Sequence, residues 1–211
     1  MTLEGVYWLG GGSAAGKSTI ARRIAARHGL AVYSTDDAMS EHAARSAPGE
    51  SPLLHEFLAM DMDARWVRRS PAAMLETFHW FRAECFAAIV EDLRRLTRTG
   101  GVIAEGFRLL PALVKPLLDS PSHAAWLLPT REFRRAVFAS RGPDWGFLSK
   151  VSDPAKALAN LLERDDLFTE RLRDETSRLG LTALDVETST TEDQLLERVT
   201  AALGLSLARP V

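Results

Sequence analysis

A glycine-rich segment that joins an apolar stretch to an amphipathic one constrains the fold of this chain more than any other feature. The segment is VYWLGGGSAAGKSTIARRIA, from Val6 to Ala25, and residues 11–18 within it satisfy the pattern G-x-x-x-x-G-K-[ST]. Small residues let the backbone turn tightly with its N–H groups inward, and a following helix adds its positive end at the same place. The pattern therefore predicts a strand, a phosphate-binding loop and a helix in succession.

The residue types of this loop predict contacts with a nucleoside triphosphate. Lys17 is expected to reach the β- and γ-phosphates, and the Ser18 hydroxyl to ligate the Mg²⁺ that bridges them. The expected nucleotide-binding residues are Gly11, Gly12, Ser13, Ala14, Ala15, Gly16, Lys17, Ser18 and Thr19. A plain flexible turn is the alternative interpretation, but a turn needs neither the lysine nor the hydroxyl.

A dinucleotide-binding fingerprint is a second interpretation of the same segment. Gly10, Gly12 and Ala15 fit G-x-G-x-x-[GA]. Asp36 follows about 20 residues later, where that fingerprint places a ribose-binding acid. However, the fingerprint has no use for residues 16–18, and neither of the two tyrosines is followed by a lysine four residues later. An NAD-dependent dehydrogenase is therefore the less favoured alternative.

Apolar segments alternate with helical ones along the whole chain and predict an α/β fold with a doubly wound parallel sheet. The expected strands lie at about 5–10, 30–37, 100–107, 123–130 and 180–188, and the expected first and last helices at 17–28 and 192–203. A five-stranded sheet of this kind, covered by helices on both faces, forms one domain. We expect that domain to span residues 1–211.

Two segments interrupt this alternation, and each is expected to cover the carboxyl edge of the sheet. Residues 51–99 predict a helical insertion on the substrate side, in which Ser70 and Pro71 begin one long helix. The apolar face of that helix would carry Met74, Phe78, Phe81, Cys85, Ile89 and Leu96. Residues 139–165 begin with a Gly-, Pro- and Ser-rich loop and predict a lid.

Acidic residues follow two of the expected strands at the edge where the phosphate loop lies. Asp36 is expected to be a base that accepts the proton of a substrate hydroxyl, and Asp37 to cap the next helix or contact the substrate. Glu105 ends the third strand and is expected to hold the Mg²⁺, directly or through water, or to bind the substrate. Arg108 follows at the same rim, where it would bind an anionic group of the substrate.

Several arginines lie before and within the expected lid. Guanidinium groups on a lid can neutralise charge that develops on a phosphoryl group during its transfer. We expect Arg135 and Arg141 to act in this way and Arg134 to contact the nucleotide, with Arg131 and Arg164 as further candidates. Because arginine is abundant in the chain, a structural role for each of them stays open.

The composition argues against several other classes of protein. Lys and Arg total 26 against 28 Asp and Glu, so the net charge of −2 provides no basic field for nucleic acid or an anionic membrane. Cys85 is the single cysteine and cannot form an internal disulfide, which favours a reducing compartment. No apolar run approaches the roughly 20 residues that span a bilayer, and no signal-peptide pattern begins the chain. We expect a cytoplasmic protein, monomeric or homodimeric.

Taken together, these residues resemble those of the P-loop NTPase superfamily and, within it, the adenylate-kinase-like small-molecule kinases. The order of loop, Asp36, Glu105 and arginine-bearing lid is similar to that of shikimate and gluconate kinases, and GGSAAGKS followed by YSTDDAM resembles the chloramphenicol phosphotransferase pattern. The resemblance implies strand order 2-3-1-4-5, with Asp36 as the base. It also implies Mg²⁺-dependent transfer of the γ-phosphate of ATP to a hydroxyl of a sugar, nucleoside, polyol acid or antibiotic. A nucleotide-binding regulatory ATPase remains the alternative.

Overall fold

Five parallel strands form one sheet in the computed structural model, which describes residues 2–142 and 145–206. The strands are β1 (Val6–Gly11), β2 (Ala31–Ser34), β3 (Val102–Glu105), β4 (Ala124–Pro129) and β5 (Thr182–Val186). Their order is β2-β3-β1-β4-β5, and each neighbouring pair is parallel. The expected fold class is confirmed, although β2 ends earlier than predicted, so Asp36 and Asp37 lie in the turn after it.

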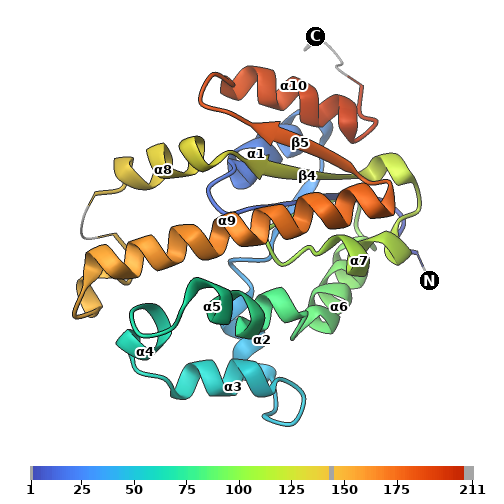
Figure 1. Cartoon of the computed structure of the whole chain (residues 1–211). Coiled ribbons are helices and arrows are strands. Elements are labelled where there is room, and N and C mark those ends of the chain that lie inside the picture. Colours follow the sequence, from blue (N-terminus) through green and yellow to red (C-terminus); the bar gives the residue numbers. More distant parts are fainter. Residues whose placement is uncertain (1, 143–144, 207–211) are drawn as a thin grey trace.

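Helices cover both faces of this sheet (Figure 1). On one face lie α1 (Lys17–His28) and α10 (Glu192–Ala202), and on the other lie α6 (Phe86–Leu96), α7 (Pro111–Val114) and α9 (Pro154–Leu179). Successive residues of β1 lie in the cores on opposite faces of the sheet. Trp8 belongs to the core with Ile89 and Phe168, and Leu9 belongs to the core with Ile24. A parallel sheet that is buried on both faces needs such uninterrupted apolar strands.

Short helices, not the single long one that we expected, fill the insertion. They are α2 (Met39–Arg45), α3 (Pro52–Ala59), α4 (Met62–Trp66), α5 (Pro71–Thr77) and the 3-10 turn η1 (His79–Arg82), followed by α6. Ser70 caps α5 as predicted, because its side chain accepts a hydrogen bond from the backbone N–H of Ala73.

The prediction of one continuous apolar helix face is wrong because the helix is interrupted between α5 and α6. Ala83 and Cys85 take φ angles of 69° and 61°, in the left-handed region that ends a helix. Cys85 therefore precedes α6 as its N-cap residue instead of lying on a buried helix face, and its side chain is half-buried. The extended Phe78 already separates η1 from α5, and Phe81 of η1 stacks on Phe168 of α9.

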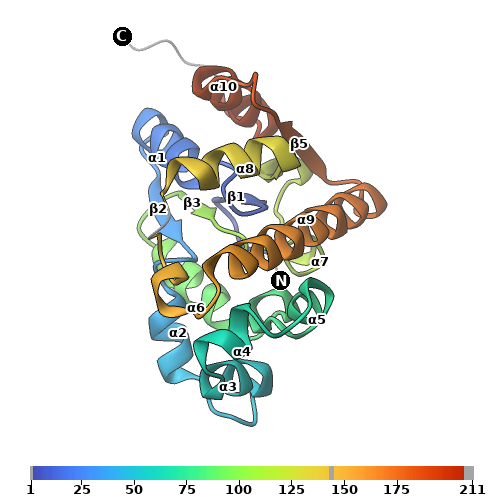
Figure 2. The same ribbon diagram turned by 60° about the vertical axis from the view of Figure 1, so that its left-hand side comes forward.

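The region expected to form a lid is part loop and part helix. After α8 (Arg131–Ser140) come the 3-10 turn η4 (Leu148–Lys150) and then α9, which begins at Pro154 and is 26 residues long. Residues 143 and 144 of the expected lid lie outside the described residues. In Figures 1 and 2, α9 crosses the molecule between the sheet and the insertion, and it packs against α4, α5, α7 and α8. In the described part of the chain, none of the helices combines the length and the apolar character needed to cross a membrane.

Candidate active site

The loop between β1 and α1 folds around the side chain of Lys17. Lys17 is only 7 % exposed, and its Nζ donates a hydrogen bond to the carbonyl oxygen of Gly12 at 2.7 Å. Gly11, Ala14 and Gly16 have positive φ angles of 130°, 63° and 80°. Loops with such alternating backbone conformations form concave nests that bind anions. The loop thus has the shape that the glycine-rich pattern predicts.

The charge around Lys17 suits an incoming phosphate group. Burial lowers the pKa of Lys17, while the carboxylates of Asp36, Glu105 and Asp165 oppose that shift. A phosphate oxygen beside the ammonium would add further negative charge and favour its protonated form. The site therefore favours an anion at the position that the loop encloses.

Ser18 and Glu105 are joined by a hydrogen bond at the start of α1. The Ser18 hydroxyl donates to Oε1 of Glu105 at 2.9 Å, and Glu105 is only 1 % exposed. Oε2 of Glu105 is buried and has no hydrogen-bond partner among the described residues. Burial raises the pKa of Glu105, and the Lys17 ammonium and the Ser18 hydroxyl oppose that shift.

These two side chains fit a Mg²⁺ ion whose coordination is completed by oxygens of a nucleotide and by waters. A buried carboxylate oxygen without a partner costs free energy, so each such oxygen needs an explanation. Mg²⁺ is usually held by one or two protein oxygens together with phosphate oxygens and waters. The Ser18 hydroxyl and the unpartnered oxygen of Glu105 are ligands of that kind beside the phosphate loop.

Asp36 lies in the turn after β2 and faces the same space as the loop. Its Oδ1 accepts a hydrogen bond of 3.3 Å from the Thr35 hydroxyl. The side chain stays exposed, yet partial desolvation by the protein around it raises the pKa of Asp36, with the Lys17 ammonium opposing the shift. Gly106 makes this arrangement possible, because a Cβ at its φ of 142° would lie 1.7 Å from the Thr35 hydroxyl oxygen. The ends of β2 and β3 can therefore approach each other closely.

Asp37 does not cap the following helix, so that expectation is wrong. The N-cap residue of α2 is Ala38, and no side chain caps this helix. The Asp37 side chain is exposed, and its backbone N–H donates to the Ser34 hydroxyl at 3.3 Å. Asp37 is also absent from the lining of the pocket beside the loop.

Arg108 is buried beneath the site instead of lying at its rim. It is 2 % exposed, and its guanidinium lies 4.1 Å from the centre of the Trp80 ring. Nη1 donates to the carbonyl oxygen of Thr35 at 3.0 Å, and Nη2 contacts Nδ1 of His42 at 3.0 Å. These contacts occupy the guanidinium with acceptors of the protein, one of them directly before Asp36. Arg108 thus supports the turn that carries Asp36 and does not contact the pocket.

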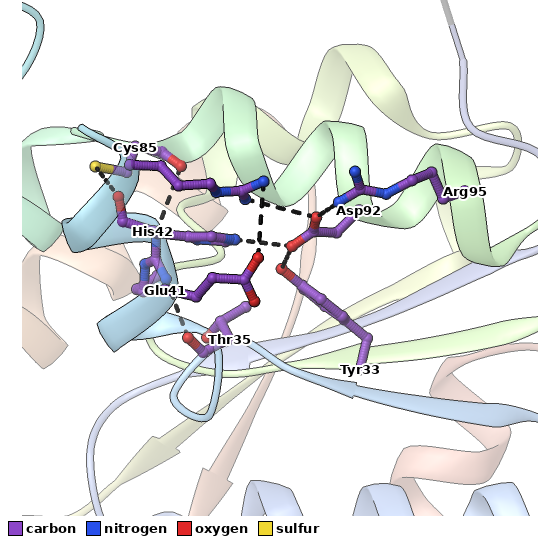
Figure 3. Close-up of polar contacts among 9 residues, drawn as sticks. Tyr33, Thr35, Glu41, His42, Cys85, Asp92 and Arg95 are labelled. Carbon is purple, nitrogen blue, oxygen red and sulfur yellow. Dashed lines mark hydrogen bonds and ion pairs between the residues drawn. The ribbon is translucent and has the colours of Figure 1, made fainter. Parts of the chain in front are cut away.

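The Arg108 contact is one end of a polar network that sequence reasoning missed (Figure 3). On the far side of His42, Nε2 lies 2.8 Å from Oδ2 of Asp92, which also accepts a hydrogen bond of 2.8 Å from the Tyr33 hydroxyl. Arg95 contacts the other oxygen of Asp92. The network joins β2, α2 and α6, and no pattern in the sequence marks residues so far apart as partners.

The arginines of the expected lid have different surroundings. Arg134 is 1 % exposed and donates to Asp166 and Thr169 of α9, so it holds α8 against α9 behind the loop. Arg135 is exposed, with Nη2 3.9 Å from Asp166. Arg141 lies over the Phe138 ring at 4.7 Å and lines the pocket beside the loop, where burial lowers its pKa.

A cavity of about 740 Å³ adjoins the phosphate loop and is lined by Ser13–Thr19, Asp36 and Arg141. We call it the aromatic pocket after the rings that form its other walls. These are Phe57, Trp66, Phe78, His79, Trp80, Phe81, Phe107, Phe133, Phe138, Trp145, Phe147 and Phe168. The insertion, α8, the described residues between α8 and η4, and α9 all contribute to this lining. In the sequence Phe78 and Phe81 have the spacing of a helix core, which is why we did not expect these two rings at the site.

Asp165 connects α9 to the phosphate loop. One carboxylate oxygen accepts a hydrogen bond from the Ser13 hydroxyl, and the other accepts two from Arg164. Both residues of this α9 pair are buried and line the aromatic pocket. Sequence reasoning named Arg164 as a candidate and gave no role to Asp165.

Comparisons with known proteins do not assign a family to this chain. No protein-family model matches the chain, and a search of curated proteins finds no significant match. An uncharacterised protein from Eubacterium ventriosum ATCC 27560 is a similar solved structure, with 13% identity, 94% of this chain and 97% of that chain covered, and a TM-score of 0.49.

Two further similar structures are kinases by name. Deoxyadenosine kinase from M. mycoides with bound dATP has a TM-score of 0.49 at 12% identity, over 94% of this chain and 99% of that chain. A gluconokinase from Sinorhizobium meliloti 1021 has a TM-score of 0.45 at 15% identity, over 97% and 94%. Likeness at this level assigns neither a family nor a function to this chain.

Proposed function

We propose that this chain is an ATP-dependent phosphotransferase that moves the γ-phosphate of ATP to a hydroxyl of a small molecule. The observation that carries the proposal is the convergence of Lys17, Ser18 and Asp36 on the aromatic pocket. The loop has the conformation of an anion nest, and a carboxylate with a raised pKa faces it across a cavity large enough for an acceptor. Phosphoryl transfer depends mainly on such positioning and on electrostatic stabilisation.

The metal site that this function needs is supplied by Ser18 and Glu105. Their hydroxyl and carboxylate oxygens would hold Mg²⁺ together with phosphate oxygens of the nucleotide. When bound, Mg²⁺ neutralises charge on the β- and γ-phosphates. The protein keeps the Glu105 carboxylate in place through the hydrogen bond from Ser18.

The transfer step uses Asp36 as its base. The acceptor oxygen forms a bond to the γ-phosphorus, and the bond from that phosphorus to the oxygen bridging to the β-phosphate breaks, which releases ADP. Asp36 takes the proton of the acceptor hydroxyl, and its raised pKa makes it a stronger base than an ordinary aspartate. Lys17 stabilises charge on the phosphates, and Arg141 is the pocket arginine that we assign to the γ-phosphate.

Assaying purified protein with ATP, Mg²⁺ and a panel of alcohols tests this proposal. We expect ADP release to rise above the basal rate with at least one acceptor, and phosphorus NMR to show an equal amount of a phosphate ester. Lys17→Ala should abolish both signals. ATP hydrolysis that no acceptor stimulates, and that yields only inorganic phosphate, would support the regulatory ATPase instead.

A thermal-shift comparison of ATP with NAD⁺ separates the remaining alternative. The contact between Ser18 and Glu105 has no use in dinucleotide binding, so we expect stabilisation by Mg²⁺ and ATP and none by NAD⁺. The reverse result would favour the dehydrogenase interpretation.

A further inference from the structure

One wall of the aromatic pocket is formed by the insertion and contains aromatic rings in contact with one another. We call it the insertion wall and define it as Phe57, Trp66, Phe78, His79 and Phe81. Phe57 meets Trp66 edge-on at 5.8 Å and Phe78 at 5.6 Å between ring centres. Phe81 stacks on Phe168 of α9 at 3.7 Å. Rings held by their neighbours in this way present fixed flat and edge surfaces to whatever enters the pocket.

Arg164 lies against this wall with one donor unused. Its guanidinium carbon is 4.7 Å from the centre of the Phe78 ring, 5.2 Å from that of Phe81 and 5.3 Å from that of Trp66. The side chain of Arg164 is 7 % exposed. Nε and Nη2 donate to Asp165 at 2.9 and 2.6 Å, whereas Nη1 is buried and has no partner among the described residues.

An unused guanidinium donor in such surroundings indicates a ligand. Buried polar groups are nearly always paired, because an unpaired one loses its hydration without compensation. The pairing with Asp165 already balances the charge of Arg164, so the free Nη1 needs an acceptor atom more than a counter-charge. A carbonyl-type oxygen or an unprotonated ring nitrogen of a bound molecule meets that need.

His79 adds a second unpartnered polar atom to the insertion wall. It is 2 % exposed, and its Nδ1 has no hydrogen-bond partner in the described part of the chain. Burial, together with the nearby Arg108, Arg65 and Arg164 guanidinium groups, lowers the pKa of His79 to about 3. The ring is therefore neutral at physiological pH, which suits a polar group without charge on the ligand.

We propose that the insertion wall binds the acceptor, and that the acceptor is an alcohol with a planar unsaturated ring and a carbonyl-type acceptor atom that pairs with Nη1 of Arg164. This inference rests on the proposed function and names the substrate class for it. A flat ring of the acceptor stacks on the rings of the wall, and this packing replaces the water that surrounds the free acceptor ring. A polyol acid or a free sugar would lose hydrogen bonds to water that these aromatic side chains do not replace.

Binding to the wild-type protein without nucleotide tests the wall directly. Trp66, Trp80 and Trp145 line the pocket, so tryptophan fluorescence reports on its occupancy. The probes are 4-(hydroxymethyl)benzamide, benzyl alcohol without the amide, the cyclohexane analogue of the benzamide, and gluconate. We expect the benzamide to bind at least about tenfold more tightly than each of the others, since each lacks a stacking ring or an acceptor atom. Equal or tighter binding of the cyclohexane analogue or gluconate would overturn the proposal.

Arg164→Lys tests the assigned hydrogen bond and keeps the charge beside Asp165. We expect the dissociation constant of 4-(hydroxymethyl)benzamide to rise about tenfold while that of benzyl alcohol stays unchanged. Arg178→Lys is the matched control, because Arg178 lies on the same helix, is exposed and pairs only at 4.0 Å with Glu175. A variant that weakened both probes equally, or neither, would contradict the assigned hydrogen bond. An unchanged far-UV circular dichroism spectrum of Arg164→Lys would show that it is folded.

The two proposals fail in different ways. If the benzamide binds as expected but no acceptor is phosphorylated, the insertion wall stands and the phosphotransferase does not. If gluconate or ribose is phosphorylated with a higher kcat/KM than deoxyadenosine, thymidine and chloramphenicol, the phosphotransferase stands and the ring-bearing acceptor class is wrong. If the benzamide fails to bind and ATP also fails, both are wrong.

Discussion

Arg108 and His42 are joined by a contact of 3.0 Å between Nη2 and Nδ1, and this contact selects the tautomer of the imidazole. A guanidinium only donates hydrogen bonds, so Nδ1 of His42 must accept. Nε2 then carries the proton of a neutral ring and donates to Asp92 at 2.8 Å. The imidazole thus links the guanidinium of Arg108 to the carboxylate of Asp92 on α6. Figure 3 shows His42 beside Asp92.

We expect Arg108 to act as a positioning residue for Asp36. Its Nη1 holds the Thr35 carbonyl, so Arg108→Lys should lower kcat by about 10- to 100-fold while ATP affinity changes less than about threefold. Steady-state kinetics and nucleotide titration measure the two effects. Arg82→Lys, an exposed residue 3.4 Å from Glu76, is the control. A loss of ATP affinity equal to the loss of kcat would point to a general structural defect.

Asp92 makes stability depend on pH in the acid range. Burial alone would raise the pKa of Asp92, but the hydrogen bonds from His42 and Tyr33 lower it below the ordinary value of 3.8. At pH values between the native pKa of Asp92 and its ordinary pKa, the unfolded state binds more protons than the native state. The stabilisation from the ionised Asp92 is therefore complete above this pH range and is lost as the pH falls through it. Asp92→Asn should therefore destabilise the protein near neutral pH and cost progressively less towards pH 2.

Urea denaturation between pH 2 and 7 measures this difference for Asp92→Asn. Tyr33→Phe, which removes one of the two hydrogen-bond donors to Oδ2 and keeps the carboxylate, should show the same pH trend with a smaller amplitude. A cost of Asp92→Asn that does not change with pH would contradict the prediction.

Asp36→Asn tests the base and its raised pKa together. Removing a general base typically lowers the rate by about 10²–10⁴-fold, and we expect that loss in kcat with nearly unchanged ATP affinity. In the wild type, the acid limb of kcat/KM should lie above pH 3.8, because partial desolvation raises the pKa of Asp36 from that value. The limb should disappear from the residual activity of the variant. Asp37→Asn, in the same turn but outside the pocket, should behave like the wild type.

Glu105→Gln should separate stability from function. A carboxyl group whose pKa is raised by burial binds more protons in the native state, so its ionised form destabilises the fold near neutral pH. The amide removes that buried charge, and we expect an equal or higher melting temperature without nucleotide. At the same time, the loss of a charged oxygen should weaken Mg²⁺-dependent ATP binding by about tenfold or more. A lower melting temperature with full Mg²⁺ affinity would assign Glu105 a structural role only.

Sequence patterns predicted the strands and the loop because both depend on local chemistry. Short apolar runs bounded by turn residues favour buried strands, and the G-x-x-x-x-G-K-[ST] pattern needs no information from distant residues. The helix break at Ala83 and Cys85 was missed because neither residue type favours a positive φ. Local propensity opposes a positive φ at these two residues. The conformation occurs together with tertiary packing in which Phe81 stacks on Phe168.

The partners of the buried charges could not be predicted for a similar reason. Arg108 follows a strand at the edge of the site, and its position suggested a substrate contact. Whether a guanidinium faces a ligand or a carbonyl oxygen of the protein depends on residues 66 and 73 positions away, which no local pattern relates to it. Arg134 was expected at the nucleotide and instead pairs with α9, 32 and 35 positions away, for the same reason.

The absent side chain at Gly106 ties two stretches of the gene to each other. A side chain there would collide with both the hydroxyl oxygen and the Cβ of Thr35 and would need a φ of 142°, so loss of the hydroxyl alone would not admit it. Removal of the hydroxyl also withdraws the hydrogen-bond donor of Asp36. Position 106 therefore restricts which residues can follow β2, and a change there would require a compensating change in the turn that carries the proposed base.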